Sequence, residues 1–235
     1  MELAIMQPTY LPWVGYFDLI NSSESFVFLD NVKFEKSSWQ TRNRIPINNQ
    51  PHYLTVPVRG SRNQIIKDVM INDDINWRNK QSATLDMAYK KHPYGRWMLD
   101  IVLPLINDSS LNNLSKLNID LIKSISKAIG MSSDFYLGSE IQAHGMKSFR
   151  LIEICHHFGS KRYYSPIGSM DYIEKEGAFR DNNIEVIYQD INMKEYQQAH
   201  VDNFISQLSI IDLMANLGAD GAKKYIDDLN QVETN

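Results

Sequence analysis

The sequence predicts an α/β protein in which helices cover both faces of an open, mainly parallel sheet. Short apolar or alternating runs are separated by amphipathic helical segments over most of the chain, and this alternation is typical of parallel sheets. Two of the runs, at residues 3–6 and 26–29, are followed at once by Gln7-Pro8 and Asp30. Ligands of such sheets bind outside the carboxyl ends of the strands, so the polar clusters behind these runs are candidate binding residues.

Each expected strand has its own local signal. Residues 3–6 are a short apolar run that must end at Pro8, because proline cannot donate to a sheet ladder. Alternating β-branched and aromatic residues predict strands at residues 52–58, 65–71 and 184–188. Brief aromatic runs predict two further strands, at residues 135–138 and 162–165. Residues 45–51, which contain two prolines, are expected to be a turn-rich connection.

The expected helices follow from apolar spacing and from end signals. A compact aromatic turn at residues 10–17 leads into a short helix, and Asp73 and Asp74 can cap a helix at about 77–91. A helix at 97–106 is expected to be interrupted by Pro104. Amphipathic spacing predicts the remaining helices at residues 110–129, 147–158, after the turn at 167–169, and at about 205–217 and 221–229.

Length and composition indicate one folded unit. We expect a single α/β domain over residues 1–235, with a helix-rich insertion at about 73–130 that caps the strand ends. Hydrophobic residues make up 43% of the chain and charged residues 22%, which is typical of a protein with a normal core.

Several functional classes are disfavoured. The net charge of −4 argues against broad electrostatic binding to DNA. The single cysteine, Cys155, cannot form an intrachain disulfide and suits a reducing cytoplasm, which is the expected location. No signal peptide is apparent, and no apolar run approaches the roughly 20 residues that span a bilayer, so no membrane partner is expected. Neither HxxxH nor HExxH occurs, so no metal site is predicted.

The turn after the first strand is the first candidate site. Gly15 would let the backbone approach a ligand closely, and Tyr10, Trp13 and Tyr16 offer flat apolar faces with polar tips. The alternative is a tightly packed corner between strand and helix, and composition alone weighs the two readings about evenly.

The segment behind the second strand is the second candidate site. Asp30 precedes Lys33, Lys36, Arg42 and Arg44, and such cations can hold an anionic ligand. A solvated basic loop is the commoner outcome for a run of charges. The interleaved Trp39 and Asn43 favour a site, because a loop exposed only to water has little use for a tryptophan.

A histidine at a helix break is a further candidate. His92 precedes Pro93 and could act as a general base near neutral pH. No partner is visible in the sequence, so an ordinary residue at a helix end is the favoured reading of His92.

The strings at residues 6–17 and 28–34, continuing to Trp39 and 42–44, resemble the WbqC-like protein family. Further matching strings lie at residues 54–58, 150–152, 163–165 with Gly168, Tyr172 and Phe179, and 208–213, so the resemblance spans nearly the whole chain. Lys33 stands where the family more often has glutamine, and Pro166 stands where it more often has glycine.

The resemblance implies a bacterial protein of O-antigen or related surface-glycan biosynthesis, including lipopolysaccharide. The implied activity is transfer of glycine, or of another aminoacyl group, to an amino sugar. The matching strings also add Tyr164 and Tyr172 to the substrate-binding candidates.

A second resemblance concerns the corner alone. A strand, a Pro-Trp-x-Gly-Tyr turn and a helix resemble the corner of the Rossmann-like nucleotidylyltransferases. Trp13 and Tyr16 replace the two histidines that stabilise charge on the transferring phosphate there, which counts against nucleotidyl transfer. A nucleotide or phosphopantetheine could still bind in such a corner.

The leading hypothesis is a transferase that forms an amide on a nucleotide-linked amino sugar. Asp30 or His92 would be the base, and Lys36 is the third catalytic candidate, binding phosphate or the oxyanion. The predicted substrate-binding residues are Gln7, Tyr10, Trp13, Gly15, Tyr16, Lys33, Trp39, Arg42, Asn43, Arg44, Tyr164 and Tyr172.

Two alternatives stay open, as does the donor. The alternatives are a nucleotidylyltransferase-like enzyme that needs magnesium and a non-catalytic protein that binds sugar nucleotides. The candidate donors are a coenzyme A or phosphopantetheine thioester, an acyl or peptidyl carrier protein, an aminoacyl-tRNA and an adenylate.

Overall fold

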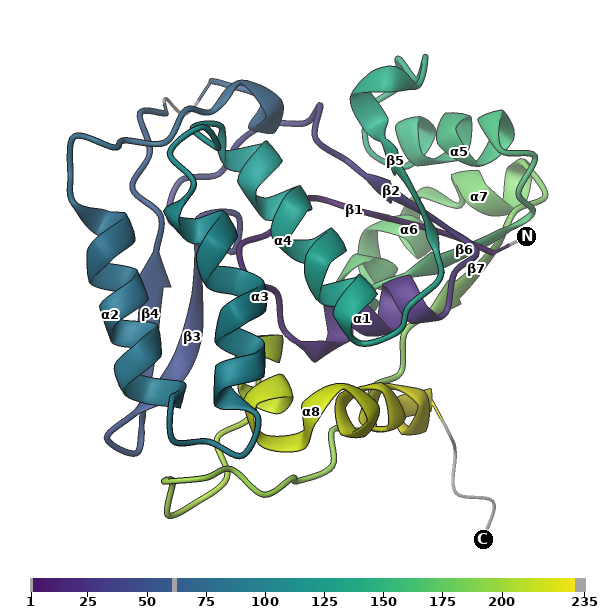
Figure 1. The fold of residues 1–235 in the computed structure, drawn as a ribbon. Helices are drawn as coiled ribbons and strands as arrows, with labels where there is room; N and C mark the ends of the chain where they lie inside the picture. The colour runs from purple at the N-terminus through teal and green to yellow at the C-terminus, as the bar shows by residue number, and fades with distance from the viewer. Residues whose placement is uncertain (1, 61–62, 231–235) are drawn as a thin grey trace, which may run out of the picture.

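The computed structural model describes residues 2–60 and 63–230, and it has an α/β fold (Figure 1). Within these residues five strands form one sheet, and every neighbouring pair is parallel. The predicted fold class, an open parallel sheet with flanking helices, is therefore confirmed. The strand order is β5 (Asp134–Leu137), β2 (Ser25–Phe28), β1 (Glu2–Met6), β6 (Arg162–Ser165) and β7 (Glu185–Tyr188).

The strand order reverses beside β1. The chain first builds outward from β1 to β2 and β5, and it then returns to the other side of β1 to add β6 and β7. In the register, Ala4 of β1 faces Phe26 on one side and Tyr164 on the other. A crevice forms outside the carboxyl ends of the strands at such a reversal, and ligands of open α/β sheets bind there.

Helices cover both faces of the sheet. The sheet side chains of Ala4 and Phe26 pack with α1 (Val14–Asn21), α4 (Leu114–Ala128) and α8 (Ile210–Asp227). Those of Leu3 and Val27 pack with α5 (Ser148–His157), α6 (Met170–Glu176) and α7 (Ala178–Asp181). Because successive side chains of a strand point to opposite faces, β1 must be apolar throughout, which its short continuous run provides.

Along the chain, a hairpin and two helices are inserted between β2 and the helix α4. The hairpin pairs β3 (Arg42–Ile47) with β4 (Gln50–Thr55) in antiparallel register. The helices α2 (Trp77–Tyr89) and α3 (Gly95–Asn107) follow, and Figure 1 shows them beside the hairpin, away from β6 and β7. The predicted helix-rich region at about 73–130 contains α2, α3 and α4; residues 1, 61–62 and 231–235 of the predicted domain lie outside the described residues.

Two sequence-based predictions are wrong, one of a connection and one of a strand. Residues 42–47, expected as a polar segment and a connection, form β3, because Asn48 and Asn49 adopt φ angles of 51° and 62° that suit a tight hairpin turn. Residues 65–71, expected as a strand, contain instead the 3₁₀ turn η1 (Ile66–Asp68). There the amides of Ile66 and Lys67 donate to the loop after β2, at Val32 and Asp30, and are not available for a ladder.

Several helix boundaries also differ from the prediction. Pro104 lies inside the continuous helix α3, at an exposed position where water can satisfy the backbone carbonyl that proline leaves unpaired. Gly177, with a φ of 64°, separates α6 from α7. The tail forms one element, α8, that is bent at Gly218 and begins only after its N-cap, Ser209. The other 3₁₀ turns are η2 (Gly138–Glu140), η3 (Ile167–Ser169) and η4 (Asp228–Asn230).

No helix within residues 2–60 and 63–230 combines the length and the apolar character needed to cross a bilayer.

A buried asparagine of α4 ties the helix layer to the turn after β1. The side chain of Asn118 is fully buried, and its Nδ2 donates to the carbonyls of Pro8, at 3.3 Å, and Gln40, at 2.9 Å. Without Asn118, both carbonyls would remain buried without this donor, and an unsatisfied buried acceptor is costly.

We therefore expect Asn118→Leu to lower the free energy of unfolding by about 2 kcal/mol. Urea unfolding followed by circular dichroism measures the change. Asn112→Leu, at an exposed position just before α4, is the control and should stay within about 0.5 kcal/mol of the native chain. Equal unfolding midpoints for the two variants would contradict the role given to Asn118.

Candidate functional site

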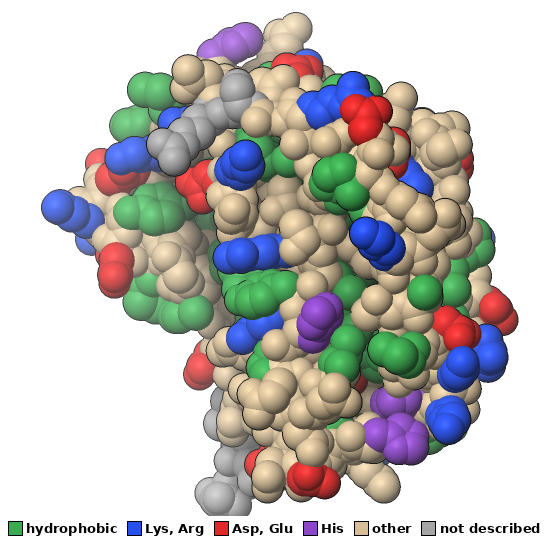
Figure 2. Space-filling model, turned by 90° about the vertical axis from the view of Figure 1, so that its left-hand side faces the viewer, with side chains coloured by type: hydrophobic (Ala, Val, Ile, Leu, Met, Phe, Trp, Pro, Cys, Tyr) green, Lys and Arg blue, Asp and Glu red, His purple; other side chains and the backbone are tan. Residues whose placement is uncertain are grey.

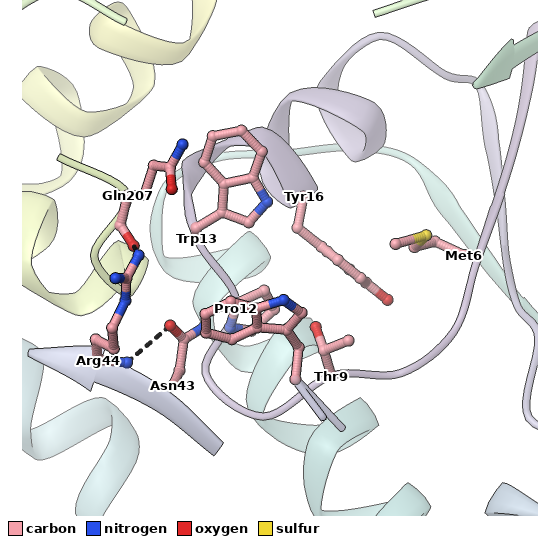
Figure 3. A pocket seen from close by; sticks show the side chains of 9 residues that line it. Met6, Thr9, Pro12, Trp13, Tyr16, Asn43, Arg44 and Gln207 are labelled. Atoms are coloured by element: carbon pink, nitrogen blue, oxygen red, sulfur yellow. Dashed lines mark hydrogen bonds between the residues drawn. The ribbon is translucent and has the colours of Figure 1, made fainter. Parts of the chain in front are cut away.

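Two cavities flank the carboxyl end of β1, at the strand-order reversal. The first, the aromatic pocket, has a volume of about 260 Å³ and is lined by Met6, Thr9, Pro12, Trp13, Tyr16, Trp39, Asn43, Arg44 and Gln207 (Figure 3). The second, the basic groove, has a volume of about 720 Å³ and is lined by Gln7, Leu29, Asn31, Val32, Lys33, Ile65, Met146, Lys147, Arg150, Leu151 and Tyr172. Consecutive residues, Met6 and Gln7, thus line the two cavities.

The turn after β1 is fixed to residues 39–44 by hydrogen bonds. The amide of Tyr10 donates to the carbonyl of Trp39 at 2.9 Å, and Asn43 Nδ2 donates to the carbonyl of Leu11 at 2.8 Å. The side chain of Gln40 also donates to Gln7 Oε1 at 2.7 Å. These bonds place Trp39 and the start of β3 against the turn.

The segment before α8 closes the aromatic pocket from another side. The amide of Ile210 donates to the carbonyl of Pro12 at 2.8 Å, and the amide of Ser209 donates to the carbonyl of Arg44 at 2.9 Å. Gln207 therefore lies beside Arg44, as Figure 3 shows. The pocket is assembled from three segments that are far apart in the sequence.

Trp13 and Tyr16 form an aromatic wall of the pocket, opposite Asn43 and Arg44 in Figure 3. The Tyr16 hydroxyl donates to the carbonyl of Gln7 at 3.0 Å, and burial raises its pKa, so it stays a neutral donor. A Cβ on Gly15 would overlap the Trp13 ring and would come within 2.7 Å of Ile191 Cδ1. Gly15 thus makes room for the indole of Trp13, whereas the sequence-based expectation was an approach by ligand.

Arg44 is the one cation in the lining given above for the aromatic pocket. Its Nη2 donates to the carbonyl of Gln207 at 3.2 Å, and its Cζ lies 5.5 Å from the centre of the Trp39 ring. Within the described residues its buried Nε makes no hydrogen bond. A guanidinium carries five N–H donors, so Arg44 has donors left for a phosphate or a carbonyl oxygen.

The other predicted cations are distributed over different places. Lys33 lines the basic groove, whereas Lys36 is exposed and lines neither cavity. The Cζ of Arg42 lies 4.6 Å from the centre of the Tyr53 ring, outside the aromatic pocket. On the face drawn in Figure 2, basic and hydrophobic side chains alternate beside a hollow. The structure therefore selects Arg44 over Arg42 as the arginine of the pocket.

Asp30 does not lie in either cavity. It is 4% exposed, and its two carboxylate oxygens accept hydrogen bonds from the amide of Ser139, at 2.8 Å, and from the Ser139 hydroxyl, at 2.7 Å. The carboxylate fixes η2 to the end of β2. This geometry places Asp30 as a structural residue and gives no support to its predicted role as a base.

His92 is also separate from the aromatic pocket. It is 8% exposed and lines a third cavity of about 550 Å³, together with Lys90, Lys91 and His200. Burial lowers the pKa of His92, and the neighbouring His200, whose ring centre is 5.2 Å away, acts in the same direction. Its cavity shares no lining residue with the aromatic pocket, so the predicted base is not brought to it.

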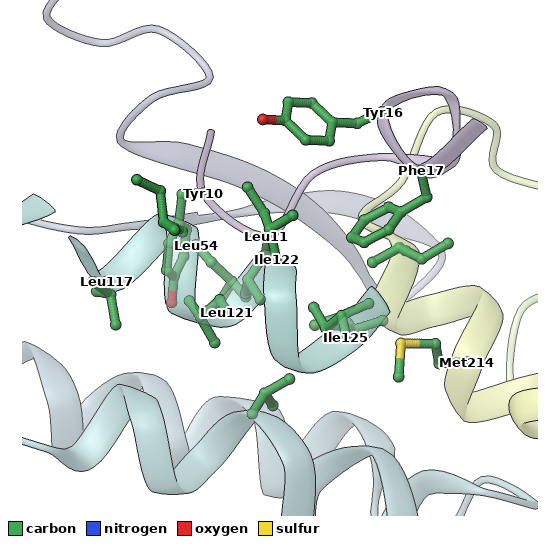
Figure 4. Packing of buried hydrophobic residues seen from close by; sticks show 14 of the residues in the cluster. Tyr10, Leu11, Tyr16, Phe17, Leu54, Leu117, Leu121, Ile122, Ile125 and Met214 are labelled. Carbon is green, nitrogen blue, oxygen red and sulfur yellow. The ribbon is translucent and has the colours of Figure 1, made fainter. Parts of the chain in front are cut away.

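The remaining predicted residues divide between the core and the cavities. Tyr10 is fully buried between Leu54 and α4 (Figure 4), and its hydroxyl donates to the side chain of Gln81. Tyr164 is buried and donates to Asp18 at 3.0 Å. Both tyrosines are core residues, in contrast to the prediction that they contact substrate. Gln7 and Tyr172 line the basic groove, and Trp13, Tyr16, Trp39, Asn43 and Arg44 come together in the aromatic pocket.

Sequence reasoning missed five polar residues of the cavities. Asn31, Lys147 and Arg150 line the basic groove, and Thr9 and Gln207 line the aromatic pocket. Lys147 and Arg150 are three positions apart at the start of α5, where Lys147 is the N-cap and Arg150 lies in the first turn. That spacing was the available signal, but the apolar stripe of the same helix dominates the pattern.

A buried carboxylate holds the segment that carries Gln207. Asp212 Oδ2 accepts hydrogen bonds from the Tyr196 hydroxyl, at 2.7 Å, and from Gln198 Nε2, at 3.1 Å, and Oδ1 accepts one from Tyr89 at 3.2 Å. Burial raises the pKa of Asp212 to about 6, although the hydrogen bonds oppose this shift. The contacts tie the segment between β7 and α8 to the start of α8.

Comparisons with known proteins agree over nearly the whole chain. The model of the WbqC-like protein family matches residues 7–224, which include every residue named above for the two cavities except Met6. The uncharacterized protein Rv1507c of Mycobacterium tuberculosis (strain ATCC 25618 / H37Rv) is 29% identical over 222 residues, covering 93% of this chain and 95% of that protein. No solved structure matches the chain significantly.

The fit between Gly15 and Trp13 predicts an unusual sign for one substitution. In a helix, Gly→Ala normally stabilises by about 1 kcal/mol. We expect Gly15→Ala to destabilise the protein by about 1–2 kcal/mol, because the added methyl group overlaps the indole. Thermal unfolding and tryptophan fluorescence measure this effect. Gly168→Ala, where a Cβ meets open space, is the control, and a stabilised Gly15→Ala would show that Trp13 does not rest on Gly15.

The buried Asp212 predicts a specific dependence of stability on pH. A carboxyl whose folded pKa is raised to about 6 from 3.8 loses stability as pH rises through this window, because the folded state holds its proton more tightly. Relative to Asp212→Asn, the native chain should lose up to roughly 3 kcal/mol between pH 4 and 7. Urea unfolding at a series of pH values measures the difference. Asp220 is exposed on the same helix, so the free energy of unfolding of Asp220→Asn should depend on pH as that of the native chain does. If Asp212→Asn also shows the same pH dependence as the native chain, the pKa of Asp212 is not raised.

Proposed function

This chain belongs to the WbqC-like protein family, and we propose that it transfers an acyl or aminoacyl group to the amino group of a nucleotide-linked amino sugar. The observation that carries the proposal is the aromatic pocket with Arg44, set beside a basic groove at the carboxyl end of β1. The proposed setting is bacterial surface-glycan synthesis, such as that of the O-antigen of lipopolysaccharide, in the cytoplasm. The buried, unpaired Cys155 is compatible with a reducing compartment.

The aromatic pocket suits one flat, neutral part of such a substrate. Trp13, Tyr16 and Trp39 offer ring surfaces, against which a sugar or a base can stack. Trp39 is 48% exposed, so its ring remains accessible from solvent. Asn43 is less available, because its Nδ2 is committed to Leu11 and its Oδ1 accepts from the amide of Arg44 at 2.8 Å.

In the proposed reaction the amine nitrogen attacks the acyl carbonyl carbon, and the carbonyl oxygen takes up negative charge. The bond to the carrier then breaks, the leaving group departs with the electron pair, and the amine proton passes to water. Arg44 can donate to the developing oxyanion, as preorganised donors do in acyl transfer. The proposal gives no chemical role to Asp30 or His92, which lie outside the pocket, and it leaves the donor among the thioesters and aminoacyl carriers named above.

A second candidate function is sugar-nucleotide binding without catalysis. Among the described residues that line the aromatic pocket there is no carboxylate and no imidazole, the usual proton acceptors. A protein that binds the sugar nucleotide for another enzyme needs neither. The two functions differ in one outcome, which is the appearance of an amide product.

Two arginines of one strand provide the test of the binding proposal. We expect nucleotide-linked amino sugars to raise the melting temperature of the native chain. A ligand at 100 times its Kd stabilises by about 2.7 kcal/mol. Arg44→Ala should weaken this binding at least about tenfold, because a charge-assisted hydrogen bond is lost. The side chain of Arg42 lies over the ring of Tyr53, so Arg42→Ala is the matched control and should bind the nucleotide-linked amino sugar as the native chain does.

The outcomes separate the hypotheses. Binding that is lost in Arg44→Ala, together with an amide detected by mass spectrometry after addition of an acyl thioester or aminoacyl donor, supports the transferase. Binding without product from any donor class favours the non-catalytic protein. Equal binding by Arg44→Ala and Arg42→Ala would show that the ligand does not use the aromatic pocket.

A further inference from the structure

We infer that the basic groove binds the diphosphate of the nucleotide-linked substrate while the aromatic pocket holds its sugar or base. This inference rests on the proposed function and assigns the charged part of the ligand to a place of its own. It brings in Lys147 and Arg150, residues outside the set that the sequence indicated.

The charges of the groove are all of one sign. Lys33, Lys147 and Arg150 line it, and no carboxylate does so among the described residues. The whole chain carries a net charge of −4, so this local excess of cations does not reflect the composition of the protein. Three cations around a concave surface favour a multiply charged anion over a neutral ligand.

Arg150 is held in a fixed orientation at the groove. Its Nε donates to the carbonyl of Gly145 at 2.8 Å, and its Nη1 donates to the carbonyl of Asn31 at 3.0 Å. These two bonds join the start of α5 to the loop after β2 and use two of the five guanidinium donors. A planar guanidinium positioned in this way can bind phosphate oxygens without further ordering.

The position in the sheet favours the same ligand. Gln7 directly follows β1, and Leu29 and Asn31 follow β2, so the groove lies outside the carboxyl ends of two adjacent parallel strands. Phosphates of nucleotides bind at this edge in open α/β sheets. Tyr172, 38% exposed, adds a phenol from the segment after β6, on the far side of the strand-order reversal.

The two cavities have complementary character. The aromatic pocket is small, with three aromatic rings, and the basic groove is larger and cationic. Met6 and Gln7 are consecutive, and the Tyr16 hydroxyl of the pocket donates to the carbonyl of Gln7, a residue of the groove. The inference therefore places a ligand that joins a ring to a diphosphate across the end of β1, with one part in each cavity.

Calorimetric titration of lysine variants tests the assignment. The probes are inorganic pyrophosphate, a nucleoside diphosphate and the matching nucleoside. We expect the Lys33→Ala/Lys147→Ala double variant to weaken binding of both phosphate-bearing probes at least about tenfold and to leave the nucleoside unchanged. Replacing both lysines by arginine should retain binding. Lys36→Ala, exposed and outside both cavities, is the matched control, and near-ultraviolet circular dichroism checks that each variant is folded.

Each outcome decides the inference. Pyrophosphate and diphosphate binding that depends on Lys33 and Lys147, but not on Lys36, supports it. Diphosphate binding that is unchanged in the double variant but lost in Arg44→Ala overturns it and leaves the proposed function standing. Pyrophosphate binding lost in the double variant, without any sugar-nucleotide binding, supports the groove and overturns the proposed function. No binding of any of these three probes by the native chain overturns the inference, and if nucleotide-linked amino sugars also fail to bind, the proposed function is overturned as well.

Discussion

The structure of the site depends on how the turn after β1 satisfies its own backbone groups. Pro8 and Pro12 carry no amide proton, and Leu11 adopts a left-handed φ of 41°, so the turn cannot pair its backbone groups as a regular element does. Buried backbone groups must nevertheless be hydrogen-bonded. The partners come from elsewhere in the chain. The side chain of Asn118 donates to the carbonyl of Pro8, and that of Asn43 donates to the carbonyl of Leu11. The carbonyl of Trp39 accepts from the amide of Tyr10, and the amide of Ile210 donates to the carbonyl of Pro12.

This single requirement explains why the aromatic pocket lies where it does. Two of the three segments that supply a partner to the turn also supply a wall of the pocket: residues 39–44 bring Trp39 and Arg44, and residues 207–210 bring Gln207. The side chain of Asp212, which holds the segment that carries Gln207, is buried and lines neither the aromatic pocket nor the basic groove. Buried polar groups thus hold the segments of the site in place, whereas aromatic rings and the guanidinium of Arg44 line the space that a ligand would fill.

The sequence predicted the sheet and most helices because their signals are local. The apolar runs, the prolines that end them and the spacing of α4 and α5 need no knowledge of distant residues. The predicted strand at residues 52–58 overlaps β4, but β3 and therefore the hairpin were missed, because Pro46 and Pro51 argue against strands. The two prolines pair with each other only when the turn at Asn48 and Asn49 is formed. The pattern that would predict the hairpin belongs to the two strands as a pair, and neither strand shows it alone.

The site was predicted less well than the fold, for a related reason. Tyr10 and Tyr16 look alike in the sequence and both are buried, yet only Tyr16 lines the pocket. Asp30 resembles a catalytic carboxylate until its partner is known, and that partner, Ser139, is 109 residues away. Arg42 and Arg44 are alike in the sequence, yet Arg42 covers the ring of Tyr53, whereas Arg44 covers that of Trp39 and lines the pocket.

The assembly of the pocket from three distant segments also has a consequence for biosynthesis. A nascent chain emerges from the ribosome in order, so the turn after β1 and residues 39–44 are available long before residues 207–210 are made. Until then, the carbonyls of Pro12 and Arg44 have only water as a partner in place of the amides of Ile210 and Ser209. The candidate site is therefore completed late in translation, and a chain released before residues 207–210 are synthesised would lack Gln207 and both of these donors.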